Sequence, residues 1–474
     1  MDILLGVVIV SIDVADLKHL SLKISRTVSD VESPSILFYE LPHLSLEMLI
    51  TLFAELSADN QCQCYMWSDG RGFSMLGFGV ARSIEYEDFT APDIVRENIQ
   101  NLLSCFDIGD SSSPILGVYS SFDRADDPQA FWAREACLTV FLPAVCLYTR
   151  DDNSYLQVAI SRKEELVQIS KVLDLLAAVY PEKSSSDAAE NVQVLGYRTD
   201  LDISTWSAAI NTIKRHIRSG EVEKVVLSRK AFLDLDRQLN LGDFLRNLHS
   251  DYPNLYLYAL SKDGFYFVGS SPEMLAEVYG GKLATMALAG SVPLEGSKDS
   301  VAQKGLALKR LLGSGKDMHE HNLVVQSIVE ALKEVATHVG VDDLTVTNLP
   351  NILHLQTLIK AYLQPGRDLL DALTYIHPTA AVAGYPRYPS IDLISALEPQ
   401  PRGLYSGTMG WIDAEGNGSL SVSLRCAAVR DKLVVVFAGC GIVSDSDPQA
   451  EYLESEAKMR PIFSSLPFGV YGIK

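Results

Sequence analysis

The stretch from 403 to 443, GLYSGTMGWIDAEGNGSLSVSLRCAAVRDKLVVVFAGCGIV, alternates short apolar runs with turns that contain glycine. This spacing is typical of antiparallel strands joined by short turns, and it predicts a β meander. Residues 254–293 repeat the pattern, as a hairpin followed by a turn and two strands joined by Gly-Gly. Because no βαβ repeat is present, we expect an α+β fold with a large layered β-sandwich core flanked by helices.

Helices are predicted beside these strands. Residues 203–221, ISTWSAAINTIKRHIRSGE, open at a Ser or Asp cap and close at a glycine. Residues 316–339 have the pattern of one long helix. Residues 447–466 begin with Asp447 as a cap and Pro448 in the first helical position.

The chain divides at a polar segment, residues 181–193, which has few apolar side chains. We therefore expect an N-terminal α+β region, 1–195, that completes the fold, and a second region, 196–474. Residues 1–17 contain an apolar run but have Asp at position 2 and no basic start. We interpret this run as a buried strand rather than a signal peptide.

The chain carries 60 Asp and Glu against 40 Lys and Arg, a formal net charge of −20. Nucleic acids and anionic membranes bind clusters of Lys and Arg, so neither is expected as a partner. No further stretch approaches the ~18 apolar residues of a membrane span. The seven cysteines include one CxC and no second pair nearby, which favours reduced thiols in the cytoplasm. An anionic ligand would need local positive charge or a metal.

Two carboxylates share the apolar face of the helix predicted at 316–339. Asp317 and Glu320 fall on the same side as Leu323 and Val324. Inward carboxylates are costly unless they are paired or bind a metal. Both acids also lie in the first turn, where they favour the helix dipole. The residues of this helix alone leave the two interpretations even.

A second charged stripe lies on the last predicted helix, where Glu451, Glu454 and Lys458 fall within about 60° of one another. Taken alone, the stripe is typical of a solvated face with a Glu454–Lys458 pair. Two helices with acids at i and i+3 could instead place four carboxylates around Mg²⁺, a hard cation that binds oxygen. That ion would also let an acidic protein hold an anionic substrate.

Three further charged residues stand in apolar surroundings. Lys224 lies among valines in a strand predicted at 222–235, where burial would lower its pKa and make it a possible general base. An edge-strand lysine that blocks aggregation fits equally well. Glu273 follows a Ser-Ser-Pro turn, and an acid at a helix start is the simple interpretation. Arg425 is predicted in an apolar strand, where it would need an anionic partner.

Gly439 and Gly441 in AGCGIV have two interpretations. They could bring backbone N–H groups close to a carboxylate, or they could mark bulges in a strand. No Walker A motif, GxGxxG–helix unit, GxSxG elbow or HExxH is present to suggest another chemistry.

These segments together resemble the motifs of the chorismate-binding enzymes. They are KVVLSR, FVGSSPEML, LAGS, KDMHEHNLVVQ, HLQT, IHPTAAVAGYPR, RGLYSGTMGWID, SLRCA and AGCGIVSDSDPQAEYLESEAK. They occur in family order over about residues 196–465, which is well over half of the chain. The resemblance implies a large α+β fold with a β-sandwich core, chorismate as the substrate and a requirement for Mg²⁺.

The resemblance also implies roles for single residues. Lys224 matches the lysine that activates water for attack at C2 of chorismate, and Glu273 matches the acid that protonates the departing C4 hydroxyl. The matching metal residues are Glu320 and Glu454 as direct ligands, with Asp317 and Glu451 acting through water. The matching substrate pocket comprises Ala289, Gly290, Ser291, His354, Tyr405, Arg425, Gly439, Gly441 and Lys458.

Within the family, the sequence resembles the isochorismate synthases, which are isomerases. Anthranilate synthases that use ammonia look different at Lys224, and one type of aminodeoxychorismate synthase has a nucleophilic lysine in place of Ala289. Salicylate synthases, which also eliminate pyruvate, tend to read HPSVTASGIPK where residues 377–387 read HPTAAVAGYPR. Salicylate synthase is therefore the main alternative, and an aminating enzyme a distant one. A non-catalytic chorismate-binding protein would need neither Lys224 nor Glu273.

Two departures from the family pattern affect the expected pocket rim. Leu294 stands where an arginine is frequent, and Ser419 stands near the position of a frequent glutamate. The sequence leaves open whether the product serves menaquinone, phylloquinone, siderophore or salicylate biosynthesis. A monomer or weak homodimer is expected.

Overall fold

The computed structural model describes residues 34–58, 62–88, 91–108, 113–123, 136–161, 165–180, 192–294, 301–349 and 352–467. It also describes residues 10–13, 16, 19, 20 and 24. The strand predicted in 1–17 is described only at Val10–Ser11, and most of the predicted boundary loop, 181–193, lies outside the described residues.

The described strands form one hydrogen-bonded network. The strands are β1 (Val10–Ser11), β2 (Ser35–Leu41), β3 (Cys64–Ser68), β4 (Ser74–Tyr86), β5 (Asp107–Ile108), β6 (Ile115–Ser120), β7 (Leu138–Arg150), β8 (Asn153–Ile160), β9 (Val194–Thr199), β10 (Lys224–Leu235), β11 (Tyr256–Lys262), β12 (Phe265–Ser271), β13 (Met274–Tyr279), β14 (Lys282–Pro293), β15 (Ala336–Val341), β16 (Thr345–Leu349), β17 (Ile352–Leu363), β18 (Gly384–Tyr385), β19 (Thr408–Asp413), β20 (Gly418–Val422), β21 (Cys426–Arg430) and β22 (Leu433–Ile442). Neighbours follow the order β17–β14–β13–β20–β19–β6–β7–β4–β3–β11–β12–β21–β22–β10, and every one of these pairs is antiparallel.

The network folds back into two facing layers with an aromatic core between them. The Tyr65 hydroxyl of β3 donates to Val118 O of β6 and Gly410 O of β19, at 3.1 and 2.7 Å. The Trp67 indole of β3 donates to Ser421 Oγ of β20 at 3.2 Å. Both rings are fully buried, and polar tips of buried aromatics need such partners. The predicted α+β fold with a β-sandwich core is therefore confirmed.

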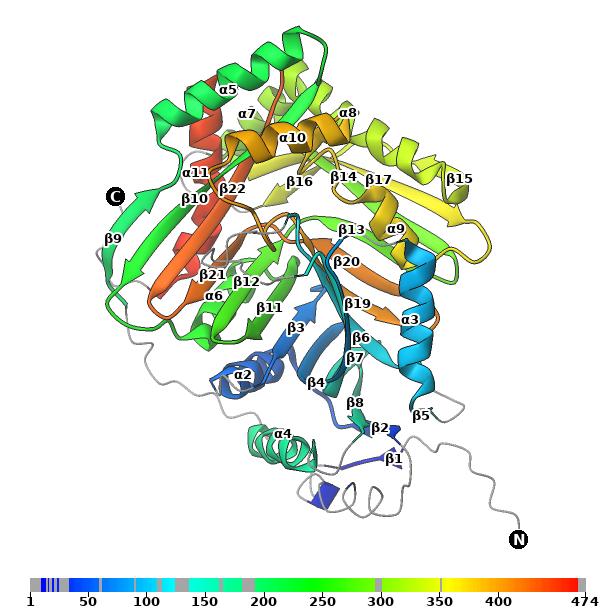
Figure 1. Cartoon of the computed structure of the whole chain (residues 1–474). Helices are drawn as coiled ribbons and strands as arrows, with labels where there is room; N and C mark the ends of the chain where they lie inside the picture. Colours follow the sequence, from blue (N-terminus) through cyan, green and yellow to red (C-terminus); the bar gives the residue numbers. More distant parts are fainter. Residues whose placement is uncertain are drawn as a thin grey trace.

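Helices cover the outside of the two layers (Figure 1). They are α2 (Leu46–Ser57), α3 (Pro92–Ser104), α4 (Leu166–Val179), α5 (Ile203–Arg218), α6 (Leu241–Asp251), α7 (Val301–Leu312), α8 (Gly315–Leu332), α9 (Leu369–Ile376), α10 (Arg387–Leu397) and α11 (Pro448–Ser465). In Figure 1, α5, α8 and α10 lie at one end of the molecule and α2 and α4 at the other. None of the helices described is both long and apolar enough to span a membrane. All seven cysteines are described, and none forms a disulfide.

Two predicted elements are wrong in detail. The helix expected at 316–339 ends at Leu332, because the β-branched residues that follow enter β15 and pair with β17. The predicted meander is in fact two hairpins, β19–β20 and β21–β22. Strands β20 and β21 do not pair with each other, since β20 pairs with β13 and β21 with β12. The separation opens the sheet where the candidate site lies.

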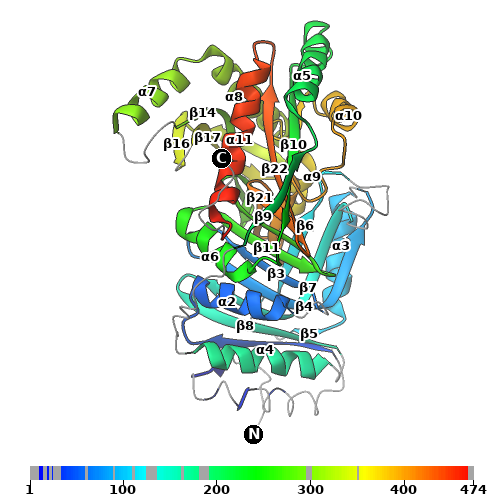
Figure 2. The ribbon, with the colours of Figure 1, turned by 90° about the vertical axis from the view of Figure 1, so that its left-hand side faces the viewer.

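The helices α8 and α11 begin near this opening, and each turns charged side chains toward it. Asp447 accepts a hydrogen bond from Ala450 N and Pro448 occupies the first turn, so α11 begins as predicted. The Ser314 hydroxyl accepts from Asp317 N and caps α8. Helix α11 packs along β22, which pairs with β10 (Figure 2).

Candidate active site

A cavity of about 670 Å³, partly open to solvent, lies between β10, β14 and β22 and the helices α8 and α11. It is lined by Val226, Pro272, Glu273, Leu288, Ala289, Gly290, Ser291, Glu320, His354, Ala381, Val382, Tyr405, Ser406, Leu424, Arg425, Phe437, Ala438, Gly439, Gly441, Glu454 and Lys458. All nine residues predicted for the substrate pocket are in this lining.

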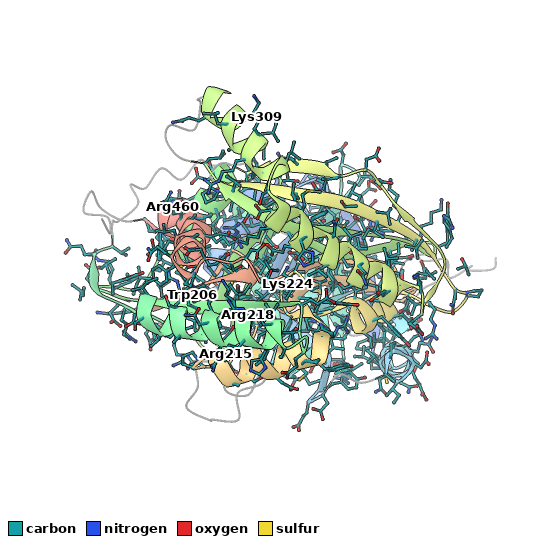
Figure 3. All side chains as sticks on the ribbon, turned by 90° about the horizontal axis from the view of Figure 1, so that it is seen from above. Trp206, Arg215, Arg218, Lys224, Lys309 and Arg460 are labelled. Carbon is teal, nitrogen blue, oxygen red and sulfur yellow. The ribbon has the colours of Figure 1, made fainter. Side chains whose placement is uncertain are left out.

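Lys224 lies behind the lining of the cavity, next to the lining residues Glu320 and Gly441. Its side chain is fully buried, and its Nζ lies 3.0 Å from Glu320 Oε1. Strand β10 pairs with β9, β18 and β22, so the alternative of a solvated edge-strand lysine is wrong. Figure 3 shows Lys224 in the interior of the molecule, whereas Lys309 lies at its periphery on α7.

Glu273 lies in the cavity wall between β12 and β13, and the helix start suggested for it is absent. Burial raises its pKa to about 8, although Lys224, Lys458 and a hydrogen bond with Thr379 act in the opposite direction. The carboxyl is therefore protonated at neutral pH, as a general acid must be.

Four carboxylates from α8 and α11 lie close enough to affect one another's charge, and Glu320 among them lies beside Lys224. Asp317, Glu320 and Glu451 are buried, and the side chain of Glu454 is 15% exposed. The solvated-face interpretation of the last helix is therefore wrong, because its charged side points inward while Leu453 on the other side is 53% exposed. Of the four acids, Glu320 and Glu454 line the cavity itself, and the other two lie behind them.

Lysines partly balance these acids. Lys316 forms an ion pair with Glu451, and Lys458 Nζ lies 2.7 Å from Glu454 Oε1. Burial and repulsion from Glu454 raise the pKa of Glu451. The pKa of Glu454 is lowered despite its burial, because Lys458 and Lys316 stabilise its anion. Ser291 Oγ also donates to Glu454 Oε1 at 2.8 Å.

The other end of the cavity is cationic. Arg425 is 7% exposed and donates to Lys458 O at 2.9 Å and to His354 Nε2 at 3.2 Å. Burial lowers the pKa of His354 far below its usual value, so the ring is neutral and can accept. Arg425 forms no salt bridge within the described ranges. The anion that a buried guanidinium requires is therefore expected to be a ligand.

Arg425 does not lie in a strand as predicted. It stands at a bend just before β21, with a φ of +50°. Positive φ is unusual for a side chain of this size and is found at functional sites. The bend belongs to the segment that separates the two hairpins.

Gly441 is required by close packing. A Cβ at this position would collide with Glu320 Oε1 and lie 2.6 Å from Lys224 Cε. At Gly439 a Cβ would lie 3.0 Å from the Tyr405 hydroxyl. Both glycines lie in regular pairing between β22 and β10, so the bulge interpretation is wrong. The absence of side chains here lets the base and a carboxylate meet.

Sequence reasoning missed several residues of the site. Lys316 was not singled out, although it pairs with Glu451. Thr379, which contacts Glu273, lies in a recognised motif but carried no assigned role. Lys316 lies 135 positions from Glu451, and Thr379 lies 106 positions from Glu273. A local sequence pattern does not predict contacts over such distances. The i, i+3 spacing of acids on two helices indicated that these acids could face inward, but the spacing alone left the solvated interpretation open.

Part of the acidic cluster, formed by Glu451 and Glu454, fits a hard divalent cation, whereas Asp317 and Glu320 are not in this close group of ligand atoms. The Glu451 and Glu454 oxygens and the Cys440 thiol lie within 4.8 Å of one another. The carboxylates suit Mg²⁺, and the mutual repulsion that raises the pKa of Glu451 is what a bound cation would relieve. The buried thiol of Cys440 has a pKa raised by burial, and it donates to Glu451 O at 3.2 Å rather than acting as a thiolate ligand.

Comparison with known proteins gives one consistent family. The model described as chorismate binding enzyme matches residues 23–467. Isochorismate synthase MenF of Bacillus subtilis (strain 168) is 31% identical over 358 residues, 74% of each chain. A salicylate biosynthesis isochorismate synthase of Pseudomonas aeruginosa is 36% identical over 262 residues, 55% of this chain and 54% of the relative. The structure of the menaquinone-specific isochorismate synthase MenF from Escherichia coli superposes with a TM-score of 0.77 at 21% identity, covering 94% of this chain and 99% of that one.

Proposed function

Because this chain belongs to the chorismate-binding enzyme family, we propose that it isomerises chorismate to isochorismate. The observation that supports this reaction best is a cavity with a protonated Glu273 in its wall and with Lys224 directly behind the lining residue Glu320. Addition of water at one carbon and loss of hydroxyl at another requires such a base and acid together.

The proposed chemistry begins at Lys224. Its amine takes a proton from water, and the oxygen of that water adds to C2 of the ring. The ring double bonds shift, the C4–O bond breaks, and Glu273 gives its proton to the departing hydroxyl, which leaves as water. One water is consumed and one is released, so the reaction needs no oxidant or second substrate. With so little driving force, catalysis depends on positioning.

Mg²⁺ is the proposed cofactor, and Glu320, Glu454, Asp317 and Glu451 would hold it. When bound, the ion would supply positive charge for the ring carboxylate and would compete with Lys224 for the carboxylate of Glu320. To act as the base, the Lys224 amine must leave its ion pair with Glu320 and lose its own proton before it takes one from water.

The cationic end of the cavity would hold the second substrate carboxylate. Arg425 and the Tyr405 hydroxyl can donate to it, and Gly439 leaves the space for its approach. Tyr405 is protonated at neutral pH because burial raises its pKa to about 12. The two carboxylates of chorismate would thus be fixed at opposite ends, with the ring between Lys224 and Glu273.

A product assay tests the proposal directly. Purified protein is incubated with chorismate and Mg²⁺ without ammonia, and the products are separated. We expect isochorismate without pyruvate. Salicylate with pyruvate would reassign the chain to the salicylate synthases, and unchanged chorismate would leave a binding protein. The names of the relatives make menaquinone and siderophore biosynthesis the routes to examine for the product.

The metal proposal has its own test. Glu320→Gln and Glu454→Gln each keep the size of the side chain but remove a ligand charge. We expect both variants to stay folded and to lose Mg²⁺-dependent turnover. Normal activity in both would refute the assignment of these ligands.

A further inference from the structure

A buried ion pair lies behind the cavity wall, in the segment between α10 and β19. The Arg402 side chain is fully buried and that of Glu398 is 4% exposed. Arg402 Nε and Nη2 donate to the two oxygens of Glu398 at 2.9 and 2.5 Å. Neither residue lines the cavity. Because burying two charges is costly, stability alone explains such a pair poorly.

The remaining hydrogen bonds of Arg402 reach two segments of the wall. Nη2 donates to Val226 O at 2.8 Å, and Nη1 donates to Val382 O at 2.7 Å. Val226 and Val382 both line the cavity. Val226 lies two residues after Lys224 on β10. Val382 lies three residues after Thr379, the hydrogen-bond partner of Glu273. One guanidinium thus joins the segment that carries the base to the segment that contacts the acid.

The pair also fixes the third side of the cavity. Glu398 accepts from Ser228 N and Ser228 Oγ, both at 2.8 Å, which attaches the pair to β10. Arg402 begins the turn that carries Tyr405 and Ser406 into the cavity wall. Its guanidinium lies 4.4 Å from the centre of the Phe122 ring, which prevents it from shifting away.

We propose that Arg402, oriented by Glu398, is a positioning residue that sets the separation of the Lys224 base and the Glu273 acid. This inference rests on the proposed isomerisation. The base and the acid must act on one ring at the same time, and a misplacement of about 1 Å can cost about 100-fold in rate. The carbonyl oxygens of Val226 and Val382 accept hydrogen bonds from the planar guanidinium of Arg402. A lysine ammonium does not reproduce this geometry.

Arg402→Lys is the informative variant. It keeps a positive charge opposite Glu398 but cannot serve Val226 O, Val382 O and the carboxylate together. We expect kcat to fall about tenfold or more while KM changes by a smaller factor, since Arg402 does not itself line the cavity. We also expect the alkaline limb of the pH–kcat profile to move by about half a unit, because Thr379 and Lys224 shift relative to Glu273.

Lys230→Met is the matched control. Lys230 is a buried cation of the same network, with a side chain 3% exposed, and its Nζ donates to Gln400 O at 2.7 Å between Glu398 and Arg402. It does not line the cavity. We expect this variant to unfold at a lower temperature but to keep kcat within about twofold of wild type and to keep its pH profile.

The results that would overturn this inference differ from the result that would refute the proposed function. Wild-type kcat and pH profile in Arg402→Lys, with only a lower unfolding temperature, would overturn the inference. Equal losses of kcat in Lys230→Met would overturn it too, since any damage to the network would then suffice. If Arg402→Lys does not fold, the double variant Glu398→Gln/Arg402→Gln, which removes both charges of the ion pair, carries the same expectation. Wild-type protein that makes no isochorismate would refute the proposed function instead.

Discussion

At the scale of single residues, the site is defined by charges held out of water. Glu273 keeps its proton because burial raises its pKa to about 8. Arg425 keeps a positive charge without a carboxylate partner among the described residues. Each group is in the state that the proposed reaction needs before any substrate binds, which reduces the reorganisation needed during reaction.

The protonation of Glu273 predicts the pH dependence of activity. Since the acid must carry a proton, kcat should fall as the pH rises through about 8. The same raised pKa favours the folded state at low pH, and this contribution to stability is lost between the unfolded pKa of about 4.3 and about 8. A pH–rate profile checks the first expectation.

Glu273→Gln should remove the proton donor with little change in shape. We expect kcat to fall by about 10²–10⁴-fold while the variant still binds chorismate. Binding can be followed by ligand-induced change in the unfolding temperature. A variant that retains more than about a tenth of wild-type kcat would contradict the assignment of Glu273 as the acid.

Gly441→Ala should disable the site without unfolding the sheet. The added methyl group would displace Glu320 and Lys224, and we expect activity to fall by about 100-fold or more. Gly305→Ala is the control, because a Cβ on that α7 glycine meets nothing within 4 Å. It should leave activity unchanged and add a few tenths of a kcal/mol or more to stability. Equal activities would show that Glu320 and Lys224 need not approach so closely.

At the scale of secondary-structure elements, the site depends on how α8 and α11 face each other. Lys316 in the first turn of α8 pairs with Glu451 in the first turn of α11. This ion pair links two helices that each carry two of the carboxylates. A cation already occupies part of the acidic cluster before any metal arrives.

Lys316→Met should therefore lower the unfolding temperature more in the metal-free protein than in the metal-bound protein. Without Mg²⁺, the buried carboxylates lose a counter-ion, and the unfolding temperature should fall. With Mg²⁺, the ion should replace the missing charge, so the increase in unfolding temperature on adding Mg²⁺ should exceed that of wild type. Thermal unfolding with and without Mg²⁺ measures both. An equal increase in the two proteins would show that Lys316 and the ion do not compete.

The sequence predicted elements better than their connections. The caps of α5 and α11 were recognisable because capping is local. The strand after Leu332 was missed because helical and strand patterns overlap there, and pairing with β17 decides between them. The site residues were found through linked motifs. Lys316, Thr379 and Arg402 were not, because their roles depend on contacts between segments distant in the chain.

At the scale of the whole molecule, the first region of the chain is part of the same sandwich. Strand β3 pairs with β11, and β6 pairs with β19. Tyr65 and Trp67 also fill the core between the layers. The second region cannot cover its own core without them.

A fragment of residues 196–474 should therefore fail to fold. Exposed edges at β11 and β19 and an open aromatic core favour aggregation. We expect no cooperative unfolding transition and no conversion of chorismate, checked by circular dichroism and the product assay. If the missing strands are the cause, co-expression with residues 1–195 as a separate chain should restore folding. A folded, active fragment would contradict the expectation.

Helix α11 follows every other described element in the chain, yet it carries Glu451, Glu454 and Lys458. A chain still attached to the ribosome, with these residues inside the exit tunnel, has a base and an acid but lacks half of its carboxylates. On the proposed mechanism, a chain without α11 should therefore be inactive, however much of its sheet has formed.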